Sequence, residues 1–472
     1  MITRRNWLKT LCAALPAAAA GTKRANILFI TADDLGLQLG CYGETRIRTP
    51  NLDRFAESAV RFDTAYVAQA SCSPSRSAMF TGLYPHANGQ YGLANAGFSL
   101  HPPLRTATIP AVLKKAGYRT GIIGKLHVEP EASFPFDLRD TNNAATRTVR
   151  GVAPKAGTFM QASDEPFFLM VNYSDPHAFR REDDRTKWYF PPQVDGLPER
   201  PIMPGPKDVF PFQQVEDDGQ WERVAGYYNA IQRLDYGLGL LLEALEKSGK
   251  ADNTLVVFIG DHGPPFARGK TTVYEAGLRI PFLVRWPGVS KAGRRQEMVS
   301  TVDIAPTIYD AAGVTPPIAM HGRSLRSVVG SGKGLWREYL AGEFHFHGAS
   351  PFYPRRAIRD SRYKLIHNLR SGSAKPSTGI DGDRAFALSR MPRYEGTPAR
   401  RAFDTFANPP EFELYDLSKD PVEFNNLAGK PELKRVEVRM KQALLEWRRQ
   451  TDDPFLDPAM IEEYSKWKNP AG

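Results

Sequence analysis

Short apolar runs alternate with amphipathic helical segments along most of this 472-residue chain, and no other feature constrains the fold as strongly. Such alternation is typical of a sheet with helices packed on both faces, so the sequence predicts an α/β fold. The strand candidates are 26–31, 121–124, 167–172, 254–259 and 281–285. The helix candidates are 51–58, 109–116, 222–248 and 303–312.

The pattern changes near Trp336, after which the apolar runs are shorter and closer together. The strand-like segments there are 356–359, 363–366 and 414–417, and a helical segment follows at 431–450. Close spacing of short strands favours antiparallel pairing. We therefore expect a large N-terminal domain over 24–335 and a smaller C-terminal α+β domain over 336–465 that carries an antiparallel sheet.

Two long segments, 191–211 and 370–410, are rich in turn-forming residues and show no clear periodicity. We predict loops in both places. Long ordered loops in compact enzymes often build the walls of binding sites. The alternative is mobile surface.

Residues 1–20 are typical of an export signal. Two arginines, Arg4 and Arg5, precede an apolar stretch that ends in small residues, and this resembles a bacterial twin-arginine signal. We therefore predict a periplasmic or secreted protein. No later run reaches the roughly 18 apolar residues that a membrane-spanning helix needs, so we expect no membrane span. If the signal is removed, Cys41 and Cys72 remain, and no disulfide is expected.

The net charge of +10, from 62 Lys and Arg against 52 Asp and Glu, would attract polyanions. A solvated basic face without a partner is the alternative. The chain has no Lys/Arg-rich run and no zinc-finger spacing, so we expect no nucleic-acid partner. Nothing in the sequence indicates the oligomeric state.

Residues 71–82 read SCSPSRSAMFTG. The serines are capping residues and Pro74 suits a first helical turn, so Cys72 is predicted at or just before a helix N-terminus. Unpaired backbone N–H groups and the positive end of the helix dipole favour an anion there, and Arg76 can add charge. By itself, Cys72 would be one more small buried residue.

Adjacent polar pairs follow two predicted strands. Asp33 and Asp34 come after the first strand, and Asp261 and His262 follow strand 254–259. The carboxyl ends of parallel strands are where open α/β sheets bind ligands. Adjacent carboxylates repel unless a cation lies between them, and oxygen ligands suit calcium or magnesium. Taken singly, each pair would be a helix cap or turn.

The segment from Cys72 to Gly82 resembles the C-x-P-S-R plus T-G signature of the formylglycine-dependent sulfatases. The resemblance implies an alkaline-phosphatase-like fold with a large, mixed, mostly parallel sheet sandwiched by helices. It also implies that a formylglycine-generating enzyme oxidises Cys72 to formylglycine. The hydrated aldehyde, a gem-diol, would then attack sulfur and form a covalent sulfate intermediate.

The same resemblance implies a calcium site. Its ligands would be Asp33, Asp34, Asp261, His262 and the oxygen of modified residue 72. The family commonly has asparagine where this chain has His262. Nitrogen is a poorer calcium ligand than oxygen, so His262 would either bind weakly or act from the second layer of contacts.

Further catalytic roles follow from matching motifs. Lys125 and His127 match a G-K-x-H segment, His177 matches a D-P-H turn, and Lys270 matches a second sulfate-binding basic residue. The resemblance implies that Lys125, Lys270 and Arg76 stabilise charge on the sulfate. It also implies that His177 binds the sulfate or protonates the leaving group, and that His127 takes a proton from residue 72. A single histidine or lysine would usually be structural or solvated.

Several stretches resemble the N-sulfoglucosamine sulfohydrolase branch of the family more closely. They are 81–93, 121–137, 263–266, 353–369 and 413–421. This resemblance implies hydrolysis of the N-sulfate of terminal N-sulfoglucosamine in heparan sulfate or heparin fragments. His345, His347 and Arg355 are then candidate contacts to the sugar. The branch has arginine where this chain has Lys270.

Three alternatives stay open. One is an O-sulfatase on another sulfated glycan, and a second is a phosphonate or phosphate monoester hydrolase. The third is a non-catalytic protein that binds polyanions on the same fold.

Overall fold

The computed structural model describes residues 24–330, 332, 336–348 and 351–467. The predicted signal over 1–20 lies outside these residues, so export stays a prediction. Within the described ranges no helix is both long and apolar enough to cross a membrane. Cys41 and Cys72 are free thiols, Cys41 half-buried and Cys72 buried.

Eight strands of the described chain form one large sheet in the order β11-β2-β10-β9-β1-β6-β4-β5. Their bounds are β1 (Asn26–Ala32), β2 (Val60–Phe62), β4 (Arg119–Ile123), β5 (Leu138–Asp140), β6 (Phe167–Tyr173), β9 (Thr254–Gly260), β10 (Phe282–Arg285) and β11 (Gly293–Arg295). Strand β10 pairs antiparallel with both β9 and β2, while the other pairs are parallel. The predicted mixed, mostly parallel sheet is confirmed.

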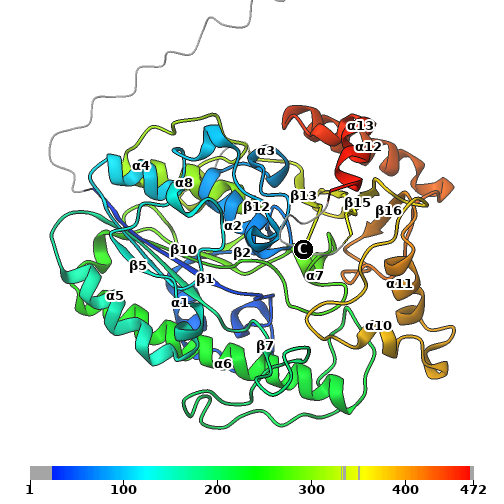
Figure 1. The fold of residues 1–472 in the computed structure, drawn as a ribbon, viewed down its shortest axis with the longest axis horizontal. Helices are drawn as coiled ribbons and strands as arrows, with labels where there is room; N and C mark the ends of the chain where they lie inside the picture. Colours follow the sequence, from blue (N-terminus) through cyan, green and yellow to red (C-terminus); the bar gives the residue numbers. More distant parts are fainter. Residues whose placement is uncertain (1–23, 331, 333–335, 349–350, 468–472) are drawn as a thin grey trace, which may run out of the picture.

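Helices cover both faces of this sheet, as Figure 1 shows. On one side lie α2 (Cys72–Thr81), α4 (Ile109–Lys115) and α8 (Ile304–Ala312), and on the other α1 (Pro50–Ser58), α5 (Val152–Gln161) and α6 (Asp218–Lys247). Side chains alternate along β1, so Ile27 and Phe29 join one apolar core while Leu28 and Ile30 join the other. Burial on both faces explains why these strands are continuous apolar runs.

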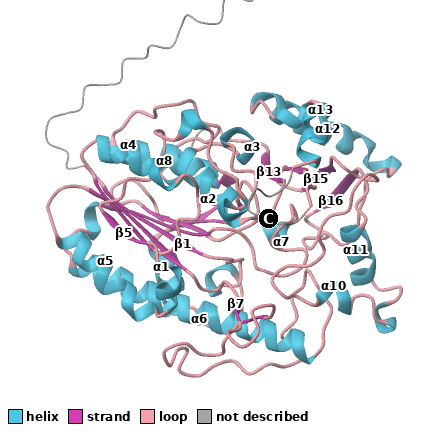
Figure 2. Cartoon of the chain, in the orientation of Figure 1, coloured by secondary structure: helices cyan, strands magenta, loops and turns pink. Residues whose placement is uncertain are grey.

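A second, antiparallel sheet follows in the order β13-β14-β15-β16 (Figure 2). Its strands are β13 (Leu340–Phe344), β14 (Arg355–Arg359), β15 (Tyr363–Asn368) and β16 (Phe412–Asp416). Helix α12 (Lys434–Gln450) packs on it through Met440 and Leu444. Strand β13 also bridges to the N-terminal part, where Glu343 pairs with Gln69. The predicted boundary at residue 335 stays a prediction.

The remaining elements are short. They are β3 (Ala65–Tyr66), β7 (Phe179–Arg180), β8 (Trp188–Tyr189), β12 (Val299–Ser300), α3 (Pro85–Asn88), α7 (Glu275–Leu278), α9 (Arg326–Val329), α10 (Ala385–Leu388), α11 (Pro398–Ala407) and α13 (Pro458–Ser465). Segment 370–410 was predicted as loop throughout, but it contains α10 and α11. In α11, Ala399, Ala402, Phe403 and Phe406 form a buried stripe, a helical period that the surrounding Gly and Pro residues obscure.

Candidate active site

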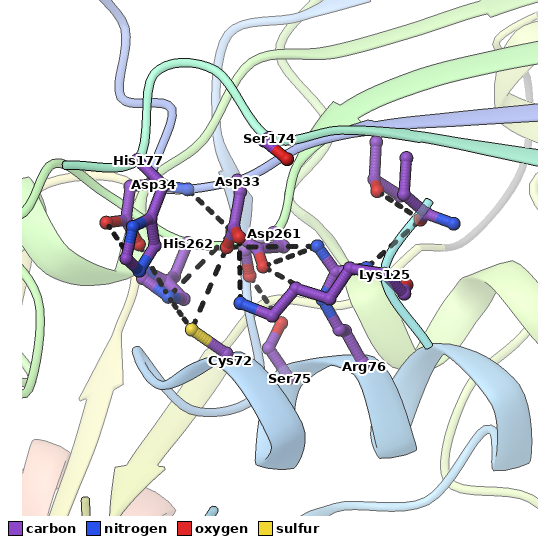
Figure 3. A network of polar contacts seen from close by, with 12 residues as sticks. Asp33, Asp34, Cys72, Ser75, Arg76, Lys125, Ser174, His177, Asp261 and His262 are labelled. Carbon is purple, nitrogen blue, oxygen red and sulfur yellow. Dashed lines mark hydrogen bonds and ion pairs between the residues drawn. The ribbon is translucent and has the colours of Figure 1, made fainter. Parts of the chain in front are cut away.

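The site lies at the carboxyl ends of four adjacent strands, β9, β1, β6 and β4 (Figure 3). Asp33 and Asp34 follow β1, and Asp261 and His262 follow β9. The segments after β4 and β6 supply Lys125, His127 and His177. Parallel strands end at one edge of a sheet, and this brings together residues up to 229 positions apart in the sequence.

Cys72 is the first residue of α2, and its side chain faces the strand ends (Figure 3). Its Sγ lies 3.3 Å from His262 Nε2 and 3.7 Å from Asp33 Oδ1. The helix is fixed to the sheet because the Ser75 hydroxyl donates to the Asp261 carbonyl at 2.5 Å. Burial raises the pKa of Cys72, but Lys125 and the other nearby cations outweigh burial and lower it to about 6.

Asp33, Asp34 and Asp261 are fully buried. One ligand atom from each of Asp33, Asp34, Cys72 and His262 lies within 4.8 Å of the others. Asp34 Oδ1 accepts no hydrogen bond, although Lys270 Nζ is 3.0 Å away and His262 Nε2 is 3.2 Å away. A buried carboxylate oxygen that accepts no hydrogen bond, beside two more buried carboxylates, fits a hard divalent cation.

His262 is oriented by its own loop. Its Nδ1 donates to the Gly263 carbonyl at 2.9 Å, which leaves Nε2 facing Cys72 and Asp34. A backbone carbonyl commonly orients metal-binding histidines in this way. Burial lowers the pKa of His262, but Asp261 and Cys72 outweigh burial and raise it to about 9. A cation bound at Nε2 would therefore displace a proton.

Arg76 contacts the carboxylates rather than the Cys72 sulfur. Its Nε donates to Asp261 Oδ2 at 3.0 Å, and its Nη1 donates to Asn172 Oδ1 and to the Lys125 carbonyl, each at 3.0 Å. Burial raises the pKa of Asp33, but Lys125, His177 and Arg76 together hold it well below its usual range. The carboxylate of Asp33 therefore stays charged despite full burial.

Two lysines approach the carboxylates from different segments. Lys125 Nζ lies 2.7 Å from Asp33 Oδ2, and Lys270 Nζ lies 3.1 Å from Asp34 Oδ2. Both lower the pKa of Cys72, so both act on the space around residue 72. Positive charge from two lysines and negative charge from the carboxylate cluster therefore meet beside residue 72.

The two predicted catalytic histidines have different neighbours. His177 Nδ1 donates to the Ala178 carbonyl at 2.7 Å, which turns Nε2 towards Asp34 at 3.8 Å. His127 has a φ of +55°, and its Nε2 lies 3.4 Å from Asn95 Oδ1. His127 and Lys125 line a cavity of about 330 Å³ that also includes Asn143. Burial, reinforced by Lys125, holds the pKa of His127 well below its usual range.

Comparison with known proteins identifies the family. Residues 25–314 match the family model described as Sulfatase. The chain belongs to the sulfatase family. A second model, described as N-sulphoglucosamine sulphohydrolase, C-terminal, matches residues 260–374 of this sulfatase.

Individual relatives agree with this assignment. The human N-sulphoglucosamine sulphohydrolase is 32% identical over 91% of this chain and 91% of its own length. An N-acetylglucosamine-6-O-sulfatase of Bacteroides thetaiotaomicron is 27% identical over 92% of this chain and 88% of its own. A solved structure in complex with its substrate D-glucosamine-2-N,6-O-disulfate superposes with a TM-score of 0.66 at 22% identity, over 91% of this chain and 99% of that one.

The predicted sugar contacts from the C-terminal part are not equivalent. His347 reaches the site, where its Nδ1 lies 2.8 Å from the hydroxyl of Ser71, the residue before Cys72. His345 is fully buried and bonded to Gln69, and Arg355 is buried against Tyr353. These two side chains are more deeply buried than His347, and contact of any of the three with a sugar stays a prediction.

Two further site residues were not predicted. Asn172, at the end of β6, bonds Arg76 and accepts from Thr31 at 2.5 Å. Its position before the D-P-H turn could have indicated a role. Asp381 lies in the predicted loop 370–410 and pairs with Lys270 at 2.9 Å. No local pattern marks it, because its position depends on packing between distant segments.

Proposed function

We propose that this sulfatase hydrolyses the N-sulfate of terminal N-sulfoglucosamine in heparan sulfate or heparin fragments. The match of residues 260–374 to the C-terminal model named for N-sulphoglucosamine sulphohydrolase carries the proposal. That range includes Lys270 and His347, both of which lie at the site. The identity to the human protein of that name, spread over 91% of both chains, adds support.

The chain's own residues suggest how the site works. Lys125 and Lys270 place positive charge around residue 72, where they can bind the oxygens of a sulfate group. Arg76 holds the carboxylates in place from behind. His177, 16% exposed at its side chain, can protonate the leaving nitrogen. His127 can take a proton from residue 72 when sulfate is released, because its lowered pKa leaves the ring neutral at pH 7 with a nitrogen lone pair to accept that proton.

Two groups that the family implies would complete the chemistry. We propose that Asp33, Asp34, Asp261 and His262 hold calcium together with residue 72. Bound calcium would supply charge that stabilises anionic oxygens. We also propose that a formylglycine-generating enzyme converts Cys72. The hydrated aldehyde would supply an oxygen nucleophile with a second hydroxyl that allows sulfate to be expelled.

An O-sulfatase is the second candidate, because relatives named as 6-O-sulfatases align over most of this chain. A phosphonate monoester hydrolase shares the fold, with a TM-score of 0.65 at 22% identity. A non-catalytic polyanion-binding protein would not need the histidines and lysines assembled around residue 72. We further propose export to the periplasm or outside, as the N-terminal sequence predicts.

The test is sulfate release from N-sulfoglucosamine beside 6-O-sulfated N-acetylglucosamine, measured by ion chromatography. The protein is co-produced with a formylglycine-generating enzyme, and peptide mass spectrometry checks the conversion of Cys72. We expect release from the N-sulfated sugar. Release from the O-sulfated sugar without release from the N-sulfated one would replace the proposed substrate and keep the enzyme class.

A further inference from the structure

A loop of the C-terminal part enters the active site and is hydrogen-bonded to the N-terminal part. Asp383 is its anchor: Oδ2 accepts from the Ala267 backbone N–H at 2.9 Å, and Oδ1 accepts from Gln220 Nε2 at 2.9 Å. Gln213 Nε2 adds a bond to Asp383 Oδ2 at 3.1 Å. All three donors belong to the N-terminal part. The loop therefore presents its other side chains in fixed positions.

Asp381, two residues earlier, points into the site. Its Oδ2 lies 2.9 Å from Lys270 Nζ. One of its carboxylate oxygens lies within 4.8 Å of both a ring nitrogen of His177 and a carboxylate oxygen of Asp34. A carboxylate thus stands beside the histidine that would protonate the leaving group.

The exposure of the side chains bears on which side of the site the leaving group occupies. The side chains of Asp33, Asp261 and Arg76 are 0% exposed, so they close the back of the site. The side chain of Asp381 is 10% exposed, comparable with the 16% of His177. The Lys125 side chain is similarly exposed at 13%, so the proposed proton donor decides the direction: the leaving part of a substrate would project past His177, and Asp381 lies on that side.

We propose that Asp381 determines specificity by favouring a leaving nitrogen over a leaving oxygen. This inference rests on the proposed function and names the group that would set its substrate class. The nitrogen of a sulfamate carries a hydrogen that can be donated to the carboxylate. The bridging oxygen of a sulfate ester has lone pairs only, which a carboxylate repels. Lys270 bonds Oδ2 of Asp381, and the proposal assigns the other oxygen, Oδ1, to the N–H of the sulfamate, so a substrate without that donor loses a hydrogen bond and meets lone-pair repulsion instead.

The charge of the product would also favour nitrogen over oxygen as the leaving atom. The S–N bond breaks with both electrons kept by nitrogen, and nitrogen takes one proton from His177. The sulfuryl group would pass to a hydroxyl oxygen of converted residue 72, and the proton of that hydroxyl would pass to water. The amine then takes a second proton from water and becomes an ammonium ion, which the Asp381 carboxylate stabilises. The leaving group of a sulfate ester would be a neutral alcohol after one protonation, so the negative charge of Asp381 would not stabilise it.

A simpler role for Asp381 would be to hold Lys270 in place. In that case, its loss would weaken binding of the sulfate group whatever the leaving atom. The affinity for sugars without sulfate distinguishes the two roles. Lys270 would bind the sulfate group, so its role does not affect these sugars, whereas the proposed role of Asp381 concerns the group at position 2 of the sugar.

The experiment compares Asp381→Asn with the wild type. The matched control is Asp183→Asn, which also removes a carboxylate paired with a cation but lies in the exposed β7–β8 hairpin. For each protein, kcat and KM are measured on N-sulfoglucosamine by sulfate release. Glucosamine, with an ammonium group at position 2, and glucose, with a hydroxyl there, are then compared as competitive inhibitors. Thermal melting checks folding, and Asp381→Ser is a second variant.

We expect wild-type enzyme and Asp183→Asn to bind glucosamine about tenfold or more tightly than glucose. Asp381→Asn should lower kcat/KM on N-sulfoglucosamine by about 10- to 100-fold and remove most of the preference for glucosamine. A loss of kcat/KM with the preference intact would overturn the inference in favour of the Lys270 role, and unchanged kcat/KM would also overturn it. If the wild type releases no sulfate from N-sulfoglucosamine, the proposed function fails before any variant is compared, and the inference fails with it.

Discussion

Gly124 joins β4 to the segment that carries Lys125 and His127, and its replacement by alanine should damage catalysis more than folding. Its φ is +90°, and an added Cβ would lie 2.1 Å from the Asn172 carbonyl oxygen. Real Cβ atoms essentially never approach closer than 3.0 Å, so the backbone must shift by about 0.9 Å. The obstacle is backbone rather than a flexible side chain, so the shift falls on the segment itself.

Such a shift passes directly to the site. The Lys125 carbonyl accepts from Arg76 at 3.0 Å, and Lys125 Nζ lies 2.7 Å from Asp33. A displacement of about 1 Å in a catalytic arrangement costs about 100-fold in rate. The positive φ adds about 1–2 kcal/mol of strain for a residue with a Cβ.

Gly117 provides the control, because it lies just before the other end of β4. Its φ is +79°, but its added Cβ would meet nothing closer than an Arg24 side-chain nitrogen at 3.7 Å. Gly117→Ala should therefore carry the φ cost without the displacement. We expect kcat/KM for sulfate release to fall about 100-fold in Gly124→Ala and by less than about threefold in Gly117→Ala, with both proteins folded by circular dichroism. Equal activities in the two variants would refute the reasoning.

Four further predictions follow from the same contacts. Cys72→Ala should reduce sulfate release to the uncatalysed background by ion chromatography, and appreciable turnover would contradict the assigned nucleophile. Removing divalent cations with EGTA should lower both activity and melting temperature, because the buried carboxylates of Asp33 and its neighbours then repel one another, and added calcium should restore both. Calorimetry with added calcium measures the binding directly, and no bound calcium would contradict the site. His347→Ala should raise KM with little change in melting temperature, whereas His345→Ala should lower the melting temperature, because His345 is fully buried; the reverse pattern would argue against the placement of both. Burial, helped by a neighbouring histidine, lowers the pKa of His321 to about 4, so between pH 6.5 and 4 the unfolded chain binds a proton that the folded chain does not. The contribution of His321 to the free energy of unfolding is therefore full above pH 6.5 and falls by about 2–3 kcal/mol as the pH drops to 4. Urea unfolding at several pH values should show a smaller pH dependence of this free energy in His321→Asn than in the wild type.

The strand ends explain why so much of the site could be predicted. Asp33 and Asp261 each follow a long apolar run directly, and that local pattern fixes both the strand and its carboxyl end. The sheet order then brings the two together, since β1 and β9 are neighbours. The motif around Cys72 adds the helix N-terminus. These signals are local in sequence, and sequence reasoning can read them.

The missed features depend on distant packing. Strand β13 was not predicted, although its Glu343 is buried beside His86, because a five-residue strand with a glycine followed by an acidic residue carries no apolar alternation. Asp381 has no local signature either, and Asp383 holds it through donors more than 100 residues away. His345 and His347 look equivalent in sequence, but His345 bonds buried Gln69 while His347, which is half-buried, bonds Ser71 beside the nucleophile position.

The buried charges make most of the site inseparable from the fold. Arg76 is 0% exposed, and it bridges Asp261 and Asn172 while facing Asp33 at 3.8 Å. Removing one member of a buried ion pair leaves an unpaired charge and costs about 3–5 kcal/mol. Because these residues share partners, the effects of their variants will not add, and a loss of activity there is also a loss of structure. Asp381 lies at the rim of the same network, so exchanging it should change substrate preference at a smaller cost in stability.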